Sequence, residues 1–181
     1  MSGFHHAGIV GGGLIGMSWA ALFMARGLAV TVVDPDPETE PRLRRFVADA
    51  WPNLVTLGLA QGDTVPDAQV SEDMDALDGV DFVQENGPDR IEIKRTIVAR
   101  IEAVVGPDVV IASSTSSLKA TDIQQGAAHP GRILVAHPMN PPHLVPMVEL
   151  VGGGQTTETA LQIAEAFYTQ MRRVTLRVKK E

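Results

Sequence analysis

The chain has 181 residues, a length that suits one globular domain, and 44% hydrophobic but only 4% aromatic residues predict a largely aliphatic core. It contains no cysteine, which excludes disulfide bonds, thiolate metal sites and a cysteine nucleophile and is compatible with a reducing cytoplasm. A net charge of −7 without any long basic run argues against nucleic acids and anionic membranes as partners. We therefore expect a cytoplasmic globular protein.

Residues 7–25 carry no charge, and their number is close to that of a membrane span. Five glycines in this stretch would destabilise a spanning helix, and no basic segment or cleavage site indicates a signal peptide. A strand, a tight glycine turn and a buried helix explain the stretch better.

Short apolar runs alternate with helical periodicity along the whole chain. Strands are predicted at residues 6–10, 29–33, 68–71, 81–85, 108–112, 133–136, 145–151 and 173–178. Helices are predicted at 14–26, at 38–60 with an interruption at Pro52, at 89–104, and at 156–171, where basic residues close the helix. A Gln61-Gly62-Asp63 turn follows the second helix. Because fully apolar strands need cover on both faces, we expect one doubly wound α/β domain over residues 1–181, with a mainly parallel Rossmann-type sheet and helices on both faces.

The segment GGGLIG, from Gly11 to Gly16, matches the G-x-G-x-x-G pattern between a predicted strand and a predicted helix. Gly11 would permit the tight turn, Gly13 the approach of a pyrophosphate, and Gly16 close packing of helix on strand. Leu14 and Ile15 complete the turn, where the helix N-terminus offers free N–H groups to phosphate oxygens. The segment therefore predicts a dinucleotide site.

Asp34 ends the second predicted strand, 18 residues after Gly16. A carboxylate there can accept hydrogen bonds from both hydroxyls of an adenosine ribose and repels a 2′-phosphate. Since Pro35-Asp36-Pro37 includes no arginine to receive such a phosphate, NAD is favoured over NADP. FAD is an alternative cofactor, and a glycine turn beside a surface aspartate is the purely structural interpretation.

A second candidate site lies between Arg132 and Gly152. His137 follows an apolar strand, and four prolines occur within nine residues, so that His137 and Asn140, each preceding a proline, are expected in extended conformations. A neutral imidazole can take the proton of an alcohol as hydride leaves the same carbon, and Glu149 could fix the tautomer of that imidazole. A turn histidine near an ordinary strand carboxylate is the structural alternative.

The other histidines carry less information. His143 lies six residues beyond His137, but without cysteine or a suitably spaced acid we expect an exposed loop histidine and no metal site. His5, His6 and His129 have no evident role.

With residues 82–119, these two segments resemble the NAD-binding domain of the L-3-hydroxyacyl-CoA dehydrogenase family, including its branch of L-gulonate 3-dehydrogenase and L-carnitine dehydrogenase. The resemblance covers essentially the whole chain. Its specific part is Ser114-Thr115-Ser116-Ser117-Leu118, followed by His137, Asn140-Pro141 and Glu149. It implies an NAD-dependent oxidoreductase, as in fatty acid metabolism, that oxidises the 3-hydroxyl of an L-3-hydroxy acid or acyl-CoA by hydride transfer.

The resemblance also implies roles for single residues. His137 would be the catalytic base, Glu149 its orienting partner, Ser116 a ligand of the substrate oxygen, and Asn140 a contact of substrate and nicotinamide. Apart from the resemblance, Lys94 is expected to be a solvated helix cation and Ser116 an ordinary loop or cap serine. Asp89 stands where the family usually has Glu. The positions that match cofactor contacts are Gly11, Gly13, Leu14, Ile15, Gly16, Asp34, Asp89 and Lys94.

Two departures from the acyl-CoA enzymes favour a small hydroxy acid as substrate. Pro138 and Met139 stand where those enzymes have aromatic residues. No Lys, Arg or His occurs between Phe46 and Asp89, where those enzymes have a basic helical hairpin that meets the CoA phosphates. The nine acids from Asp63 to Asp89 would repel phosphates.

The family continues into an all-helical domain that supplies a further active-site Asn, much of the substrate cleft and the homodimer interface, and we expect this domain to be absent from the chain. The isolated chain should then bind NADH but turn over slowly or not at all. The alternative function is a dinucleotide-binding sensor or structural module without turnover.

Overall fold

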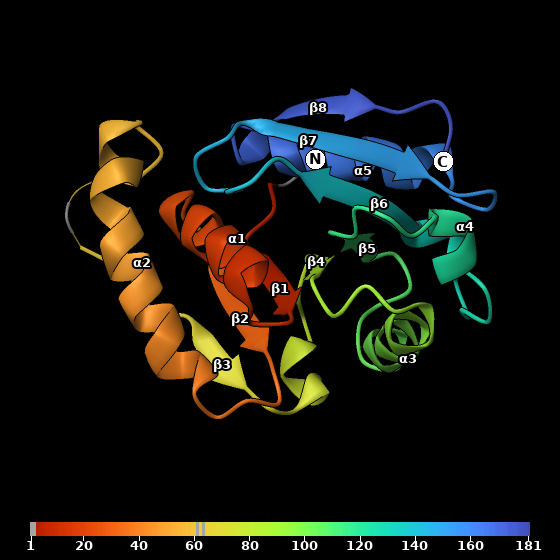
Figure 1. Ribbon diagram of the computed structural model, residues 1–181, viewed down its shortest axis with the longest axis horizontal. Helices are drawn as coiled ribbons and strands as arrows, with labels where there is room; N and C mark the ends of the chain where they lie inside the picture. Colours follow the sequence, from red (N-terminus) through yellow and green to blue (C-terminus); the bar gives the residue numbers. More distant parts are fainter. Residues whose placement is uncertain (1–2, 61, 63) are drawn as a thin grey trace.

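The computed structural model describes residues 3–60, 62 and 64–181; Gln61 and Asp63 of the predicted turn lie outside the described residues. One sheet runs in the order β3-β2-β1-β4-β5-β6-β7-β8, and its neighbours are parallel except that β7 is antiparallel to β6 (Figure 1). The strands are β1 His6–Val10, β2 Ala29–Val33, β3 Gln69–Ser71, β4 Phe82–Glu85, β5 Val110–Ser113, β6 Ile133–Pro138, β7 Met147–Gly152 and β8 Val174–Arg177.

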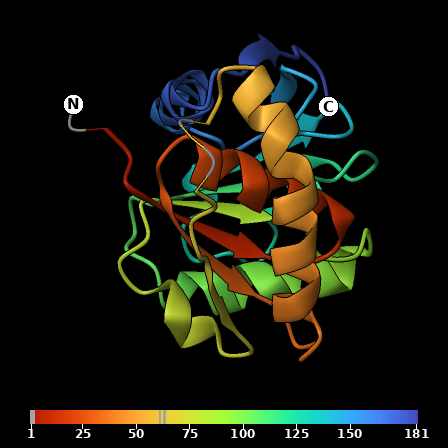
Figure 2. The same ribbon diagram turned by 90° about the vertical axis from the view of Figure 1, so that its left-hand side faces the viewer.

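Helices cover both faces of the sheet, as predicted for a doubly wound fold (Figures 1 and 2). One face packs against α1 Leu14–Ala25, α2 Thr39–Thr56 and α5 Glu158–Gln170. The other packs against α3 Ile91–Glu102, α4 Ala120–Ile123 and the 3₁₀ helix η1 Met74–Leu77, and a second 3₁₀ helix, η2, spans Pro130–Arg132. The short helices α4, η1 and η2 were not predicted, because one helical turn carries no hydrophobic period to detect.

The uncharged stretch 7–25 divides into β1, the glycine turn and most of α1. In the part of the chain that the structure describes, no helix combines the length and the apolar character needed to cross a bilayer. The predicted strand, turn and buried helix are therefore confirmed.

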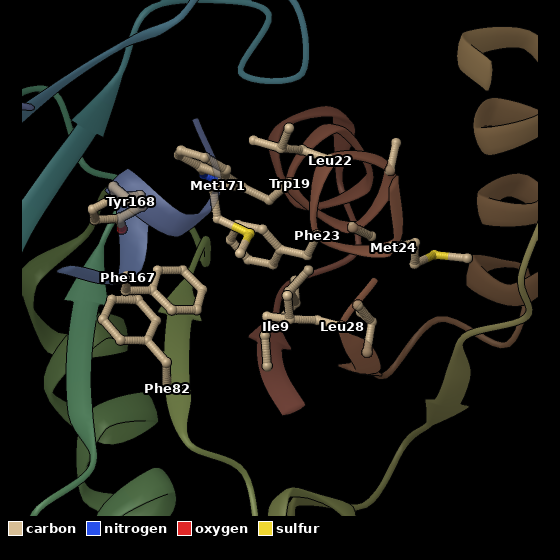
Figure 3. Close-up of a cluster of buried hydrophobic side chains, with 14 of the residues drawn as sticks. Ile9, Trp19, Leu22, Phe23, Met24, Leu28, Phe82, Phe167, Tyr168 and Met171 are labelled. Atoms are coloured by element: carbon tan, nitrogen blue, oxygen red, sulfur yellow. The ribbon is translucent and has the colours of Figure 1, made fainter. Parts of the chain in front are cut away.

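Most of the few aromatic residues gather in the core between α1, α5 and the sheet (Figure 3). Phe82 on β4 and Phe167 on α5 stack with ring centroids 3.8 Å apart, and Phe23 meets Phe167 edge-on at 5.1 Å. Trp19 stacks on Phe23 at 5.3 Å. Each such pair adds about 0.5–1.5 kcal/mol beyond its buried area, so this cluster fixes α1 and α5 over the middle of the sheet.

The expected interruption of the second helix at Pro52 is wrong, because α2 runs through it to Thr56. Pro52 is exposed while its neighbours Trp51 and Leu54 are buried, so packing outweighs the one backbone hydrogen bond that the proline removes. The helix nevertheless ends before residue 60, since Gly58 adopts a φ of +65° just beyond it.

The end of the last helix also differs from expectation. No basic residue lies in the last turn of α5; Arg172 and Arg173 follow it instead, and Arg172 has a φ of +55°. Arg173 is buried and donates hydrogen bonds to backbone oxygens of the loop between β6 and β7. The backbone N–H groups of Arg172 and Arg173 donate to the Thr169 and Tyr168 oxygens, so the two arginines close the helix through backbone hydrogen bonds just beyond its last turn.

Candidate active site

The carboxyl ends of the central strands meet at the point where the strand order reverses. From β1 the chain passes outward to β2 and β3, and it then returns to β4 on the opposite side of β1. Loops that leave β1 and β4 in opposite directions open a crevice at this edge of the sheet, where doubly wound folds bind ligands.

The glycine turn after β1 is closely packed at two positions and open at the third. Gly11 has a φ of +95°, and a Cβ there would lie 2.8 Å from the Asn86 backbone oxygen. A Cβ on Gly16 would lie 1.9 Å from the Gly11 oxygen. Around Gly13, by contrast, a Cβ would meet nothing within 4 Å. The turn therefore leaves open the space that the sequence assigned to a pyrophosphate.

The first turn of α1 suits phosphate oxygens. Its cap residue Gly13 provides no side-chain hydrogen bond to the helix, and no acidic residue lies in the first turn. Leu14 is 73% exposed beside the open space at Gly13. The N–H groups and positive end of the helix dipole are thus available to an anion, and the residues present fit the pyrophosphate of a dinucleotide.

Asp34 follows β2 and is fastened to the glycine turn. Its Oδ2 accepts a hydrogen bond from the backbone N–H of Gly12 at 2.6 Å, and its Oδ1 accepts one from the N–H of Asp36 at 2.9 Å. The nearby Arg42 is paired with Asp36 at 2.8 Å. A fixed carboxylate therefore stands where an adenosine ribose would lie. This arrangement fits NAD better than NADP, whose ribose carries a 2′-phosphate.

A cleft of about 200 Å³ continues from the turn along the ends of β4, β5 and β6. It brings together six of the twelve predicted site residues. Outside its lining lie Gly11, Gly13, Leu14, Gly16 and Asp34, and Glu149 lines an adjoining hollow with His137 and Ser116. The six in its lining are Ile15, Asp89, Lys94, Ser116, His137 and Asn140.

His137 and Glu149 form a hydrogen-bonded pair across two antiparallel strands. They are direct partners in the register of β6 and β7, and His137 Nδ1 lies 3.0 Å from Glu149 Oε2. The side chains are 26% and 34% exposed, so water or a ligand can reach them. A carboxylate on Nδ1 favours the tautomer with the proton on that nitrogen, which leaves Nε2 able to accept a proton.

Lys94 is buried rather than solvated, so the expectation from residue chemistry alone is wrong. Its Nζ donates to both carboxylate oxygens of Glu85, at 2.8 and 3.1 Å, and to the Gly87 oxygen at 2.9 Å. Asp89 lies 3.5 Å away and remains 40% exposed. The buried pair fixes the loop after β4 and presents Asp89 at the cleft.

A network of polar side chains lies under the cleft and was not predicted from the sequence. Ser114 Oγ accepts hydrogen bonds from Trp19 Nε1 and Gln84 Nε2 and donates to Asn86 Oδ1 at 2.7 Å. Burial raises the pKa of the Tyr168 hydroxyl well above its ordinary value, and that hydroxyl donates to Gln84 Oε1. The detectable signal was Gln84, an uncharged polar residue within an apolar strand.

The neighbouring Ser116 is exposed and lines both the cleft and the adjoining hollow. The turn in this loop is held by Thr115, whose Oγ1 accepts hydrogen bonds from the N–H groups of Ser117 and Leu118. The Ser114 hydroxyl is engaged in the polar network beneath the cleft. Ser116 is thus placed to meet a ligand beside His137 while Thr115 performs the local capping.

His143 is buried, at 7% exposure, and the expectation of an exposed loop histidine is wrong. Its ring Nδ1 lies 2.7 Å from Ser18 Oγ on α1. The reason is the proline-rich loop, which folds back over α1 and carries the ring into the interior. The other expected loop position, Asn140, does face the cleft.

Comparison with known proteins agrees with this geometry. Residues 6–181 match the family model for the NAD binding domain of 3-hydroxyacyl-CoA dehydrogenase. L-carnitine dehydrogenase of Streptomyces coelicolor is 49% identical over 160 residues, covering 88% of this chain and 50% of that protein. L-carnitine dehydrogenase of Pseudomonas aeruginosa is 42% identical over 173 residues, covering 95% of this chain and 54% of that protein. The chain thus spans about half the length of the curated relatives it matches.

Solved structures share the fold. A 5-formyl-3-hydroxy-2-methylpyridine 4-carboxylic acid 5-dehydrogenase matches with a TM-score of 0.88 and 31% identity, covering 98% of this chain and 58% of that one. (S)-3-hydroxybutyryl-CoA dehydrogenase from Ralstonia eutropha matches with a TM-score of 0.89 and 27% identity, covering 98% and 64%. The predicted family and cofactor are confirmed: the chain belongs to the 3-hydroxyacyl-CoA dehydrogenase family of NAD-dependent oxidoreductases, in the branch of the L-carnitine dehydrogenases, and carries the family's NAD-binding domain.

Proposed function

We propose that residues 1–181 form the cofactor-binding and proton-accepting half of an enzyme that oxidises the hydroxyl of a small L-3-hydroxy acid. The observation that carries the proposal is the His137–Glu149 pair at the cleft, with Nδ1 and Oε2 3.0 Å apart. A protein that only bound a dinucleotide would need neither residue. NAD, when bound, supplies the hydride acceptor.

Residues of this chain bind the cofactor, accept the proton and orient the substrate. Asp34 holds the adenosine ribose, and the open first turn of α1 faces the pyrophosphate. His137 accepts the hydroxyl proton on Nε2, and Glu149 stabilises the imidazolium that results. Ser116 donates to the substrate oxygen, and Asn140 orients substrate and nicotinamide between β6 and the glycine turn. Asp89, set by the buried Lys94, contacts the cofactor near Gly87.

As substrate, a small hydroxy acid suits the negative charge of this chain better than an acyl-CoA, which carries phosphates. The chain has no basic residue between Phe46 and Asp89, and α2 is followed by an irregular segment rather than by the second helix of a hairpin in the described residues up to β3. The relatives at 42–49% identity named above are L-carnitine dehydrogenases. We take L-carnitine and L-gulonate as the first substrates to test.

The rest of the enzyme completes the site. We propose that a helical half supplies the other wall of the substrate cleft and the contacts of a homodimer, and that the enzyme acts in the cytoplasm, where a chain without cysteine is at no disadvantage. The 181-residue chain alone should therefore bind NADH and show little turnover.

The test combines this chain with the part of the Streptomyces coelicolor L-carnitine dehydrogenase that the chain does not match, fused or added in trans. L-carnitine, L-gulonate and 3-hydroxybutyryl-CoA are assayed by NADH formation, and His137→Asn is the matched variant. We expect turnover of a hydroxy acid, a loss of about 10³-fold or more in kcat for the variant, and unchanged NADH affinity. Turnover that survives His137→Asn would refute the assigned base. NADH binding without any turnover would favour the sensor or structural module.

A further inference from the structure

The loop between β6 and β7 carries Asn140 at one end and is fastened to the dinucleotide helix near its middle. Asn140 lines the cleft. Three residues on, the backbone N–H of His143 donates to Ser18 Oγ at 3.1 Å, and the ring Nδ1 lies 2.7 Å from the same oxygen. Ser18 is on α1, five residues after Gly13. These contacts, here called the Ser18–His143 clasp, tie the Asn140 loop to the helix that faces the pyrophosphate.

The hydrogen bonds of the clasp suit a neutral ring. Ser18 Oγ accepts the backbone N–H of His143, and its own hydrogen is available to Nδ1 of a neutral ring. In that arrangement Nδ1 is the acceptor and the ring proton sits on Nε2. A protonated ring would carry a hydrogen on Nδ1 as well and could no longer accept from Ser18.

The surroundings favour the neutral ring. Phe46 on α2 meets the imidazole edge-on, with centroids 5.5 Å apart, and Ser18 and Phe46 bring no charge. The charged neighbour is Arg173, which donates to the Pro142 oxygen at 3.1 Å and the Val145 oxygen at 3.2 Å. Burial and the positive charge of Arg173 lower the pKa of His143 below its ordinary value. Arg173 keeps its own charge, since burial lowers its pKa only to about 10.

The clasp joins two elements that line the cleft. Ile15 on α1 and Asn140 on the loop both line it, and Ser18 and His143 each follow three residues later in the sequence. The adenosine half of the site lies at the glycine turn and at Asp34, whose carboxylate is held by the backbone N–H groups of Gly12 and Asp36 and not by the loop between β6 and β7. A loosened clasp should therefore disturb the nicotinamide end of the site and spare the adenosine end.

We propose that the Ser18–His143 clasp is a positioning device for the cofactor reaction: neutral His143 holds the Asn140 loop against α1 at the distance that the nicotinamide end requires, and protonated His143 releases the loop. This inference rests on the proposed function and adds His143 and Ser18 to it as positioning residues.

The test compares two ligands on the 181-residue chain. NADH reaches both ends of the site, whereas ADP-ribose lacks the nicotinamide and occupies only the adenosine end and its phosphates. Ser18→Ala removes both hydrogen bonds of the clasp, and His143→Leu removes the one made by the ring. His143→Asn keeps an acceptor oxygen near the position of Nδ1 and cannot be protonated. We expect the first two variants to weaken NADH by about five-fold or more and ADP-ribose by less than about two-fold, with affinity retained in His143→Asn.

A pH series on the wild-type protein gives a second test, whose result does not depend on whether a variant folds. Between pH 7.5 and 5, wild-type NADH affinity should fall while ADP-ribose affinity stays level, and His143→Asn should remove this difference although His137 is still present. Equal weakening of both ligands in Ser18→Ala, or a wild-type pH response that persists in His143→Asn, would overturn the clasp. Failure of wild-type protein to bind NADH at all would instead sink the proposed function.

Discussion

Three carboxylates at the carboxyl edge of the sheet have different roles, because each has different neighbours. Asp34 accepts two backbone N–H groups, Glu85 is buried against Lys94, and Glu149 meets the ring of His137. Asp34 and Glu149 could be predicted as candidates from the sequence, because Asp34 directly follows a predicted strand and Glu149 lies in one, each next to a recognisable motif. The Glu85–Lys94 pair could not, since its burial depends on how α3 packs over β4.

Asp34 should decide between NADH and NADPH. Asp34→Asn removes the charge that repels a 2′-phosphate while keeping a hydrogen-bonding side chain of the same size. We expect the ratio of the NADPH to the NADH dissociation constant to fall by about ten-fold or more. Fluorescence titration with both nucleotides measures the ratio, and an unchanged ratio would remove Asp34 from the ribose site.

His143 should make the stability of the fold depend on pH. Its folded-state pKa lies below the ordinary value of 6.5, so the unfolded chain binds more protons in the interval between the two values. The contribution of the neutral His143 ring to the free energy of unfolding is complete above about pH 6.5 and is lost as the pH falls through the folded-state pKa. Urea unfolding at several pH values should show a smaller loss for His143→Asn than for wild type. Identical pH profiles would contradict the buried neutral ring.

Whole elements explain why distant residues meet. The antiparallel turn from β6 into β7 sets His137 opposite Glu149, and the two side chains share a face because directly paired residues of neighbouring strands point the same way. The sequence predicted both strands and both residues but contained no sign of their register. Likewise, the proline-rich loop was predicted to be restricted, but its return onto α1 depends on the packing of Phe46 and Ser18.

The glycine turn offers a matched pair of variants. Gly16→Ala would place a Cβ 1.9 Å from the Gly11 oxygen and must displace α1 from β1, so we expect a loss of stability of about 2 kcal/mol or more together with NADH binding. Gly13→Ala meets nothing within 4 Å and should fold normally. Its methyl group enters the space left for the pyrophosphate, so it should weaken NADH by about ten-fold or more. Thermal melts and titrations separate the two effects. Normal NADH binding by Gly13→Ala would place the phosphates elsewhere.

The buried pair beneath the cleft should behave as a unit. Lys94→Met leaves Glu85 buried without its cation, at a cost of about 3–5 kcal/mol in the free energy of unfolding. Adding Glu85→Gln should recover part of that loss, because the second change removes the uncompensated charge. Urea unfolding of the single and double variants measures the coupling, and strictly additive losses would show that the two residues act separately.

The order of strands and helices in the whole molecule could be predicted from the sequence. The hydrophobic periodicity, the glycine turns and the acidic residues that follow strands all indicate the same fold. Confirmed are the doubly wound sheet, the glycine turn and the family. What the sequence could not supply is the set of long-range polar contacts, from Tyr168 through Gln84 to Ser114 and from Ser18 to His143. Those contacts join residues between 30 and 125 positions apart, and no periodic pattern in the sequence relates the two partners.

We propose that this chain is the NAD-binding half of a dehydrogenase, with the cofactor lying from Asp34 over the open turn of α1 to His137. Fluorescence titration of the purified 181-residue chain with NADH, followed by displacement with ADP-ribose, tests this most directly. We expect saturable NADH binding, complete competition by ADP-ribose, and weaker binding in both Asp34→Asn and Gly13→Ala. A wild-type chain that folds but does not bind NADH, or NADH binding that is equally strong in both variants, would contradict this assignment.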